Sequence, residues 1–324
     1  MLPDKSSEFS LIDSFRSQLR AMPGVELGIG DDAAVVEWGS RCGLLAADML
    51  LDGVHFDTSS QSPVAIGRKA LAVNLSDVAA MAGVPRFALI SLALPRSASA
   101  DFAARIFEGL KSIADEFNTA IVGGDTTSWD GPFAINVSIV GDVVGGRAVT
   151  RSGAKPGDWL FVTGELGGSL LGRHLTFVPR VREASVLHRA VNLHAMIDVS
   201  DGLVADLYHI LEESGVGAVL GAAAIPVSEA ARRVGGDWSP LEHALGDGED
   251  FELLFAVSPD DGAKLVSENS TGTRLSRIGE VTVEQTCLLK TEAGELKPLG
   301  RLGWAHALDS VELCGKDGAL NTRR

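Results

Sequence analysis

Acidic residues lie beside glycine or at the ends of predicted strands at six points along this chain. They occur in the segments GIGDD at 28–32, AD at 47–48, LSD at 75–77, GGD at 123–125, DVSDG at 198–202 and GDGED at 246–250. Glycine lets a backbone come close to a ligand, and carboxylate oxygens are the ligands that hard cations such as Mg²⁺ prefer. Carboxylates from converging loops would repel one another unless they were protonated or held a divalent metal. The pattern predicts a site that binds a nucleotide together with Mg²⁺.

Each of these motifs, taken alone, is also typical of ordinary turns and helix caps. Asp77 differs, because it lies inside a helical pattern where Asp is a mediocre helix former. The chain has no Walker motif and no protein-kinase motif set. The segment GELGGS at 164–169 follows a predicted strand. Its amides could bind a phosphate, or the glycines could simply allow a tight strand–helix connection.

Charge and composition narrow the class of protein. The 324 residues include 43 acidic and 28 basic side chains, for a formal net charge of −15. Such a surface repels nucleic acid and anionic lipid, so we expect neither as a partner. No apolar run approaches the ~18 residues that span a bilayer, and the first ten residues lack a signal-peptide pattern. Three scattered cysteines argue against a disulfide framework, so we expect a cytoplasmic protein.

The spacing of apolar residues predicts helices and strands in both halves of the chain. Helices are expected at 8–22, 63–81, 99–118, 167–177, 183–193 and 203–214. Strands are expected at 35–36, 44–49, 86–95, 119–122, 133–144, 159–163, 196–199, 251–257, 274–281 and 287–290. This content indicates an α/β class with mixed sheets (α+β), and the length favours two domains.

A change in composition marks the expected domain boundary. Residues 145–158, with the sequence GGRAVTRSGAKPGD, are rich in Gly, Ala, Lys and Pro and show no apolar period. We therefore expect an N-terminal domain at 1–144, a linker at 145–157, a C-terminal domain at 158–308 and a polar tail at 309–324.

Taken in order, the motifs resemble the thiamine-monophosphate kinase family. The matching segments are ELGIGDDAAV at 26–35, DGVHF at 52–56, KALAVNLSDVAAMAGVP at 69–85, VGGDTT at 122–127, RAVTRSGAKPGDWLFVTG at 147–164, IDVSDGL at 197–203 and GDGEDFELLF at 246–255. The resemblance extends over residues 8 to 305. NLSDVAAMAG and TRSGAKPGD are the most specific segments, whereas GIGDD or SDGL alone would indicate only a wider ATP-using superfamily.

The resemblance implies transfer of the γ-phosphoryl group of ATP to thiamine monophosphate, which gives thiamine diphosphate and ADP. It also implies several Mg²⁺ ions, a C-terminal sheet flanked by helices, and a homodimer built on the N-terminal domains. The family's metal-binding carboxylates match Asp32, Asp48, Asp77, Asp125, Asp198 and Asp201. Its nucleotide-binding positions match Gly124, Asp125, Arg151 and Ser200, and its thiamine-binding positions match His55, Glu249 and Trp304.

The chemistry of the implied reaction suits these residue types. A phosphate monoester is largely dianionic near neutral pH, so it needs no dedicated general base. It needs in-line positioning and neutralisation of two anionic groups, to which Arg151 would add a fixed positive charge. An indole such as Trp304 could stack on the thiazolium cation, and Glu249 could offset its charge. Family members commonly carry hydroxyl residues where this chain has Ala46 and Ala47, so the number of metal ions stays open.

Two alternatives stay open from the sequence. The first is another member of the superfamily, such as aminoimidazole ribonucleotide synthetase. Selenophosphate synthetase is disfavoured because Cys42 precedes a strand, and the hydrogenase-maturation enzyme because Cys314 is not terminal. The second is a non-catalytic acidic module that binds divalent metal without ATP turnover. The chain lacks the calcium-loop pattern that such a sensor would carry.

Overall fold

The computed structural model describes residues 12, 15–20, 22–39 and 41–304. Residues 22–304 form one compact unit, and the two terminal segments are assigned to a second unit. The predicted helix at 8–22 lies partly outside the described residues, although Ile12 and residues 15–18 are helical. The predicted polar tail at 309–324 lies wholly outside them.

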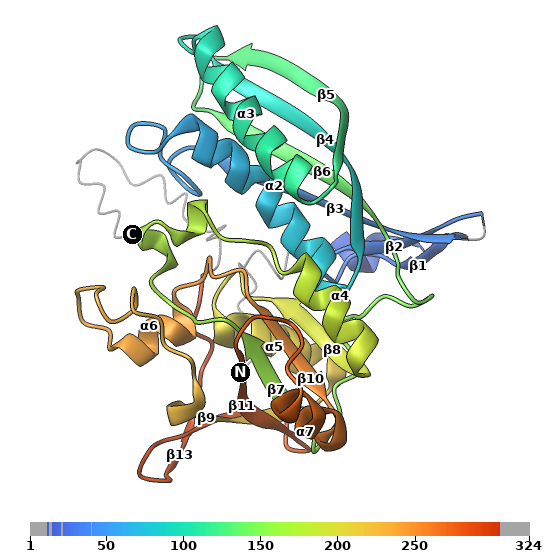
Figure 1. Ribbon diagram of the computed structural model, residues 1–324, viewed down its shortest axis with the longest axis vertical. Coiled ribbons are helices and arrows are strands. Elements are labelled where there is room, and N and C mark those ends of the chain that lie inside the picture. The colour runs from blue at the N-terminus through green and yellow to red at the C-terminus, as the bar shows by residue number, and fades with distance from the viewer. Residues whose placement is uncertain (1–11, 13–14, 21, 40, 305–324) are drawn as a thin grey trace. The chain divides into compact units, whose positions relative to one another are not determined.

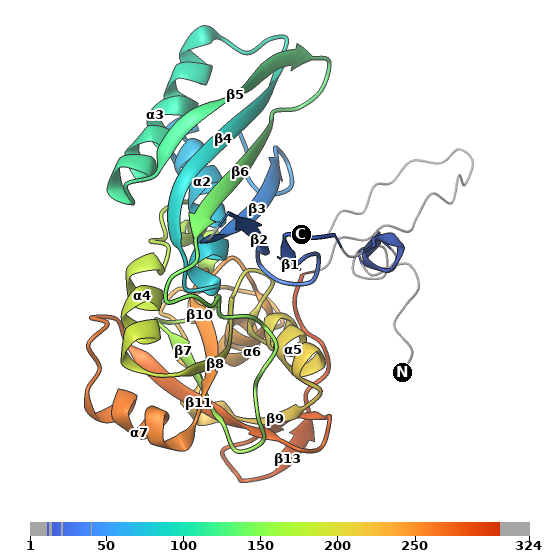
Figure 2. The same ribbon diagram turned by 90° about the vertical axis from the view of Figure 1, so that its right-hand side faces the viewer.

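The first half of the main unit is a six-stranded sheet with two helices on one face (Figure 1). The strand order is β1-β2-β3-β6-β4-β5, and only the β4–β5 pair is parallel. The strands are β1 (Val25–Leu27), β2 (Ala34–Trp38), β3 (Arg41–Leu51), β4 (Val84–Pro95), β5 (Ala120–Trp129) and β6 (Ala134–Asp142), and the helices are α2 (Pro63–Ala80) and α3 (Ala100–Glu116). Within residues 22–39 and 41–304, no helix covers the other face of this sheet (Figure 2).

The second half is a seven-stranded mixed sheet, which Figure 2 shows with helices around it. The strand order is β13-β12-β9-β11-β7-β10-β8, and β9 and β12 form its parallel pair. The strands are β7 (Trp159–Thr163), β8 (Leu193–Asp198), β9 (Gly217–Gly221), β10 (Leu253–Val257), β11 (Leu275–Thr282), β12 (Cys287–Lys290) and β13 (Leu296–Pro298). The helices are α4 (Val181–Ala190), α5 (Leu203–Ser214), α6 (Pro240–Gly246) and α7 (Pro259–Ser267), with short 3₁₀ turns at Ser169–Leu171, Arg173–Leu175 and Ala222–Ala224.

Helix α2 is the central element of the molecule. It begins at Pro63, whose fixed backbone suits the first helical position, and it is buried on nearly every side. It packs on α3, where the backbones meet at Gly67 and Gly109, and it also contacts β3, β6, α4 and β8. Because α2 touches both sheets, polar side chains on it can meet residues from either half.

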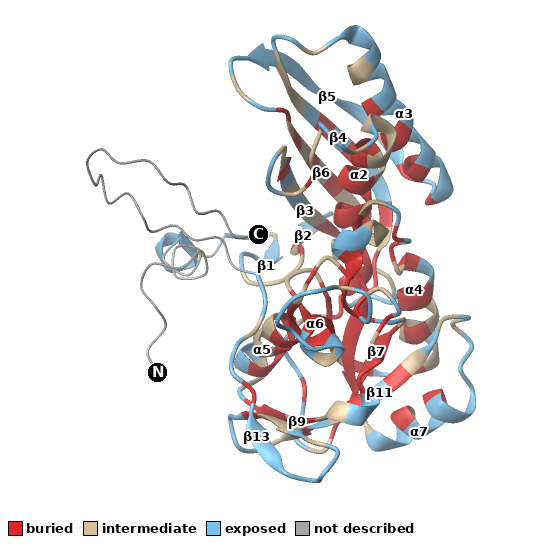
Figure 3. Ribbon diagram, turned by 90° about the vertical axis from the view of Figure 1, so that its left-hand side faces the viewer, coloured by how far each residue is buried: buried red, intermediate tan, exposed pale blue. Residues whose placement is uncertain are grey.

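Buried apolar residues fill the space on both faces of the second sheet (Figure 3). Successive residues of β7 alternate between two clusters: Phe161 joins the cluster that includes α2, while Leu160 and Val162 join the one beneath α5. Within the described residues, no helix is both long enough and apolar enough to cross a membrane.

The structure confirms the predicted mixed α/β class with two sheets. The helix expected at 167–177 is wrong, because this stretch forms only 3₁₀ turns separated by Gly172. The strand expected at 119–122 continues to Trp129, so Gly124 and Asp125 lie within a strand and not in a loop. The exact linker and domain bounds stay a prediction.

Candidate active site

Three carboxylates from distant parts of the chain converge in the described structure. One oxygen each of Asp32, Asp77 and Asp198 lies within 4.8 Å of the others. Asp32 comes from the loop after β1, Asp77 from α2, and Asp198 from the end of β8. Asp48, on β3, adjoins them through a hydrogen bond with Asp77. We call these four residues the carboxylate group.

The carboxylate group is short of compensating charge. Burial, followed by the charge of Asp32, raises the pKa of Asp198 to about 8. Burial raises the pKa of Asp48 to about 6, and burial together with the charge of Asp48 raises the pKa of Asp77 well above its ordinary range. Asp32 Oδ2 is buried without a hydrogen-bond partner among the described residues. An unpaired buried oxygen beside crowded carboxylates fits a divalent cation.

Arg151 supplies the positive charge that the described structure sets against this group. Its Nη2 lies 2.6 Å from Asp32 Oδ1, and its backbone amide donates to Asp31 Oδ2 at 3.0 Å. Burial alone would lower the pKa of Arg151, but the charge and hydrogen bond of Asp32, with the charges of Asp31 and Asp206, together raise it. Arg151 Nε is buried and has no acceptor in the described part of the chain. This guanidinium therefore retains a donor for an anionic ligand.

Two loops of the second half are joined beside the carboxylate group. The backbone amide of Glu249 donates to the carbonyl oxygen of Ser200 at 2.6 Å, and that of Phe251 donates to Val199 at 2.7 Å. Gly248 has a φ of 75°, and a Cβ there would lie 2.7 Å from the Ser200 oxygen, so only glycine fits. The joined loops place Ser200 and Glu249 next to each other.

The predicted thiamine-binding residues lie around these loops. His55 Nδ1 accepts the Leu51 amide at 3.0 Å, which places the proton of the neutral ring on Nε2. Trp304 is 51% exposed, and its amide donates to the carbonyl of Asp201 at 2.9 Å. A Cβ on Gly303 would lie 2.6 Å from that carbonyl, so glycine lets the chain approach so closely. Asp201 is half-buried and lies outside the carboxylate group.

Gly124 and Asp125 are exposed on β5, the edge strand of the first sheet. Neither belongs to the carboxylate group. Asp125 Oδ1 accepts the amide of its neighbour Thr126 at 2.9 Å. The described chain thus brings four of the six predicted metal-binding residues together and leaves Asp125 and Asp201 apart from them.

The GELGGS loop is not a phosphate cradle in this structure. The Gly167 amide donates to Asp250 Oδ2 and the Gly168 amide to Asp247 Oδ2, both at 2.8 Å. The Ser169 hydroxyl is hydrogen-bonded to Asp250 as well. Because carboxylates already occupy these donors, the glycines serve the connection between two segments of the fold.

Sequence reasoning missed four residues that shape the site. Asp31 holds the Arg151 backbone, the Ser76 hydroxyl bonds to Asp198, and Asp206 accepts the amides of residues 201 and 202 at 3.1 Å. The fourth is Lys69, whose amine contacts Glu249. Asp31 and Ser76 stand beside predicted residues in the motifs GIGDD and LSD, which is a signal for them. Asp206 and Lys69 act through partners that no local motif reveals.

Comparison with family models finds two matching domains. Residues 30–143 match the AIR synthase related protein, N-terminal domain, and residues 163–287 match the corresponding C-terminal domain. The first match covers β2 to β6, and the second extends from the end of β7 to the start of β12.

Similar proteins extend over most of the chain. The thiamine-monophosphate kinase of Rhodopirellula baltica is 44% identical over 296 residues, which is 88% of this chain and 92% of that protein. The Escherichia coli K12 enzyme of the same name is 36% identical over 92% of this chain and 98% of its own length. The solved structure of AaThiL complexed with AMPPCP and TMP has a TM-score of 0.81 at 32% identity, covering 94% of this chain and 99% of that one. The chain therefore belongs to the thiamine-monophosphate kinase family.

Proposed function

We propose that this protein transfers the γ-phosphoryl group of ATP to thiamine monophosphate, releasing thiamine diphosphate and ADP. The observation that carries the proposal is the carboxylate group, in which the buried Asp32 Oδ2 lacks a partner among the described residues. Beside it, Arg151 Nε is a buried donor without an acceptor there. The Asp32 oxygen is suited to bind a cation and the Arg151 donor to bind an anion, and a metal–nucleotide complex provides both.

We propose that Asp32, Asp48, Asp77 and Asp198 hold Mg²⁺, with Asp201 and Asp125 as further ligands. The oxygen-only donor set suits a hard cation, and relatives with an ATP analogue bound support nucleotide use. Bound Mg²⁺ would neutralise the crowded phosphate charge that opposes phosphoryl transfer. Ala46 and Ala47 offer no side-chain oxygen, so any ligand from that part of β3 would be a backbone carbonyl.

The remaining residues bind and orient the two substrates in this proposal. Arg151 contacts the nucleotide through its spare donor, with Ser200 and the backbone at Gly124 as further contacts. His55, Glu249 and Trp304 line the thiamine side, where the half-exposed indole of Trp304 stacks on the cationic ring. The acceptor phosphate is its own nucleophile, so no side chain is assigned as general base.

We further propose a homodimer built on the uncovered face of the first sheet. Met49, Phe87 and Val122 are 60%, 46% and 57% exposed on β3, β4 and β5. Phe87 and Val122, together with Leu89, line a hollow of about 440 Å³. Apolar exposure of this kind, next to the open edge of β5, is typical of a protein interface.

Phe87→Glu tests the dimer. A buried glutamate at the interface would separate the subunits, so sedimentation velocity should show a dimer for the wild type and a monomer for the variant. Glu108→Ala, on the exposed side of α3, is the control and should sediment as the wild type does. A monomeric wild type at micromolar concentration would refute the dimer.

Incubation with ATP, Mg²⁺ and thiamine monophosphate tests the reaction itself. Chromatography should show thiamine diphosphate and ADP in equal amounts, with none after EDTA and none when free thiamine is the acceptor. Folded protein that binds ATP but forms no thiamine diphosphate would favour another acceptor of the same superfamily. Because the reaction consumes ATP, a cytoplasmic location remains part of the proposal.

A further inference from the structure

Lys69 is a buried cation that the proposed reaction does not use. It lies on α2, and its side chain is only 1% exposed. Burial lowers the pKa of this amine, and the nearby Glu249 carboxylate opposes that shift. An ammonium group in such a place destabilises a fold unless its partners are well placed.

The partners of Lys69 come from both halves of the molecule. Its Nζ lies 2.5 Å from Glu249 Oε2 and donates to the backbone carbonyl of His55 at 2.7 Å. His55 lies in the loop after β3, and Glu249 lies between α6 and β10. One amine therefore joins two residues that are far apart in sequence and that both belong to the proposed thiamine-binding set.

The backbone of Glu249 shows that this placement is held against local preference. Glu249 has a φ of 58°, in the left-handed region that residues with a Cβ rarely adopt. The hydrogen bond from its backbone amide to the Ser200 carbonyl and the ion pair of its side chain with Lys69 together fix this conformation. The Glu249 side chain is 22% exposed, so it reaches the accessible side while Lys69 stays behind it.

We infer that Lys69 is a positioning residue that sets Glu249 and the His55 loop for binding the acceptor. The inference rests on the proposed function. It also changes the expected role of Glu249: paired with a cation at 2.5 Å, this carboxylate orients the acceptor through hydrogen bonds and is not a net countercharge for a thiazolium ring. Lys69 touches no substrate itself.

A double-mutant cycle with Lys69→Met, Glu249→Gln and the double variant tests this role. Lys69→Met should raise the KM for thiamine monophosphate by about tenfold or more, because truncating one member of a buried charge pair leaves the other unpaired. The KM for ATP and kcat should stay within about twofold, since a positioning role toward the acceptor leaves nucleotide binding intact. The double variant should match Glu249→Gln alone, because both act through one contact.

Lys264→Met is the matched control. Lys264 is also a helix lysine that donates to a backbone carbonyl, that of Ala190 at 2.9 Å, but it is exposed. Its removal should leave both KM values unchanged. If Lys69→Met does not fold, the double variant, which leaves no unpaired charge, still decides the question by comparison with Glu249→Gln.

Three results would overturn the inference: an unchanged acceptor KM in Lys69→Met, equal rises in both KM values, or losses that add in the double variant. Wild-type turnover is measured in parallel. A wild type that forms no thiamine diphosphate would refute the proposed function. An active wild type with an unaltered Lys69→Met variant would refute only the role of Lys69.

Discussion

Two buried acidic clusters of this protein differ in how their charge is balanced. The carboxylate group of Asp32, Asp48, Asp77 and Asp198 lies where α2 meets the end of β8. The second cluster, Asp250 and Glu252, lies just before β10, and we call it the arginine-bound pair. Asp250 and Glu252 are each 1% exposed, whereas in the carboxylate group only Asp198 is fully buried and Asp32, Asp48 and Asp77 are partly buried.

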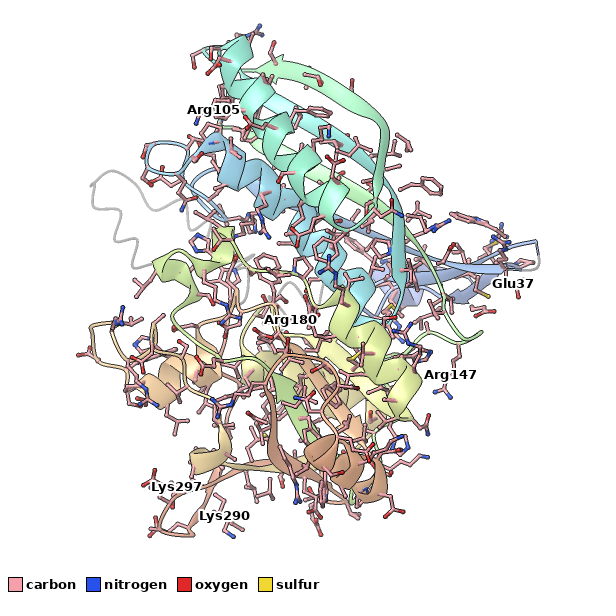
Figure 4. All side chains as sticks on the ribbon, viewed as in Figure 1. Glu37, Arg105, Arg147, Arg180, Lys290 and Lys297 are labelled. Carbon is pink, nitrogen blue, oxygen red and sulfur yellow. The ribbon has the colours of Figure 1, made fainter. Side chains whose placement is uncertain are left out.

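Every carboxylate oxygen of the arginine-bound pair has a donor. Glu252 accepts Arg173 Nη2 at 2.5 Å, Arg180 Nε and Nη2 at 2.7 Å, and the Thr163 hydroxyl at 2.5 Å. Arg180, labelled in Figure 4, stands at the start of α4. Asp250 accepts the Gly167 amide and the Ser169 hydroxyl. Such a saturated cluster has no capacity left for a ligand.

The carboxylate group has the opposite balance. Asp77 and Asp48 bond to each other, and Asp32 Oδ2 has no partner among the described residues. Among the described residues, Arg151 lies at ion-pair distance from only one of the four carboxylates, that of Asp32. The two clusters are equally acidic in kind, so the lack of compensating donors, and not acidity, marks the carboxylate group as the candidate site.

The largest expected effect is a loss of activity when a residue of the carboxylate group is replaced. Asp77→Asn should lower turnover by about 10³-fold, which corresponds to about 4 kcal/mol of transition-state stabilisation lost with a metal ligand. Stability without metal should not fall, because the variant removes a carboxylate from a crowded group. Steady-state kinetics at saturating Mg²⁺ and thermal melting in EDTA measure the two quantities. A fully active Asp77→Asn variant would remove this residue from the site.

The second expected effect is a loss of stability, with little change in activity, when the arginine-bound pair is altered. Glu252→Gln should lower the free energy of unfolding by about 3 kcal/mol, because it removes the buried anion that Arg173 and Arg180 share. For a unit of this size the melting temperature should fall by about 6–12 °C. Turnover measured well below the melting temperature should change little. A stable but inactive Glu252→Gln variant would erase the distinction between the clusters.

A third effect depends on pH. Folding raises the pKa of Asp48 from 3.8 to about 6 and that of Asp198 from 3.8 to about 8. Between about pH 4 and pH 8 the metal-free folded protein therefore binds more protons than the unfolded chain. Its stability therefore falls as the pH rises from about 4 to 8. Mg²⁺ competes with those protons, so at a concentration of about 100 times its Kd it should stabilise by about 2.7 kcal/mol at pH 8 and by much less at pH 5.5. Calorimetry with Mg²⁺ or EDTA checks this; equal Mg²⁺ stabilisation at both pH values would contradict it.

The smallest effect compares two hydroxyls. Ser76 bonds to Asp198 in the carboxylate group, and Ser169 bonds to Asp250 in the arginine-bound pair. Ser169→Ala should cost about 1.5–3 kcal/mol of stability without changing the Mg²⁺ requirement. Ser76→Ala should instead raise the pKa of Asp198 further and shift the pH at which Mg²⁺ stabilises upward by about one unit. The same calorimetric titrations separate the two; identical behaviour would count against the comparison.

The chain's own patterns predicted several elements well and others poorly. Helix α5 begins and ends as predicted, at Leu203 and Ser214, because its apolar period is regular and Gly215 ends it in a left-handed conformation. Strand β5 was cut short because glycines 123 and 124 are typical of a turn, and only its pairing with β4 keeps it extended. The apolar residues of 167–177 are spaced as in a helix. Carboxylates of the 247–250 loop, however, bind the Gly167 and Gly168 amides and hold the start of this segment out of an α-helix.

In the site, too, motifs indicate some residues and not others. The motifs marked Asp32, Asp77 and Asp198 as candidates, and the family resemblance grouped them; that they meet is seen only in the structure. The motifs could not reveal that Lys69 meets Glu249, a contact across 180 residues, nor which acidic segments would be saturated by arginine. Those facts depend on tertiary packing around α2, which a linear pattern does not encode.

If the under-compensated carboxylate group is the divalent-metal site, it should bind Mn²⁺ without nucleotide at pH 8. Electron paramagnetic resonance counts the bound Mn²⁺. We expect tight Mn²⁺ binding by the wild type and by Glu252→Gln, displacement by Mg²⁺, and loss of that binding in Asp32→Asn. Unchanged Mn²⁺ binding in a folded Asp32→Asn variant would show that the metal site lies elsewhere.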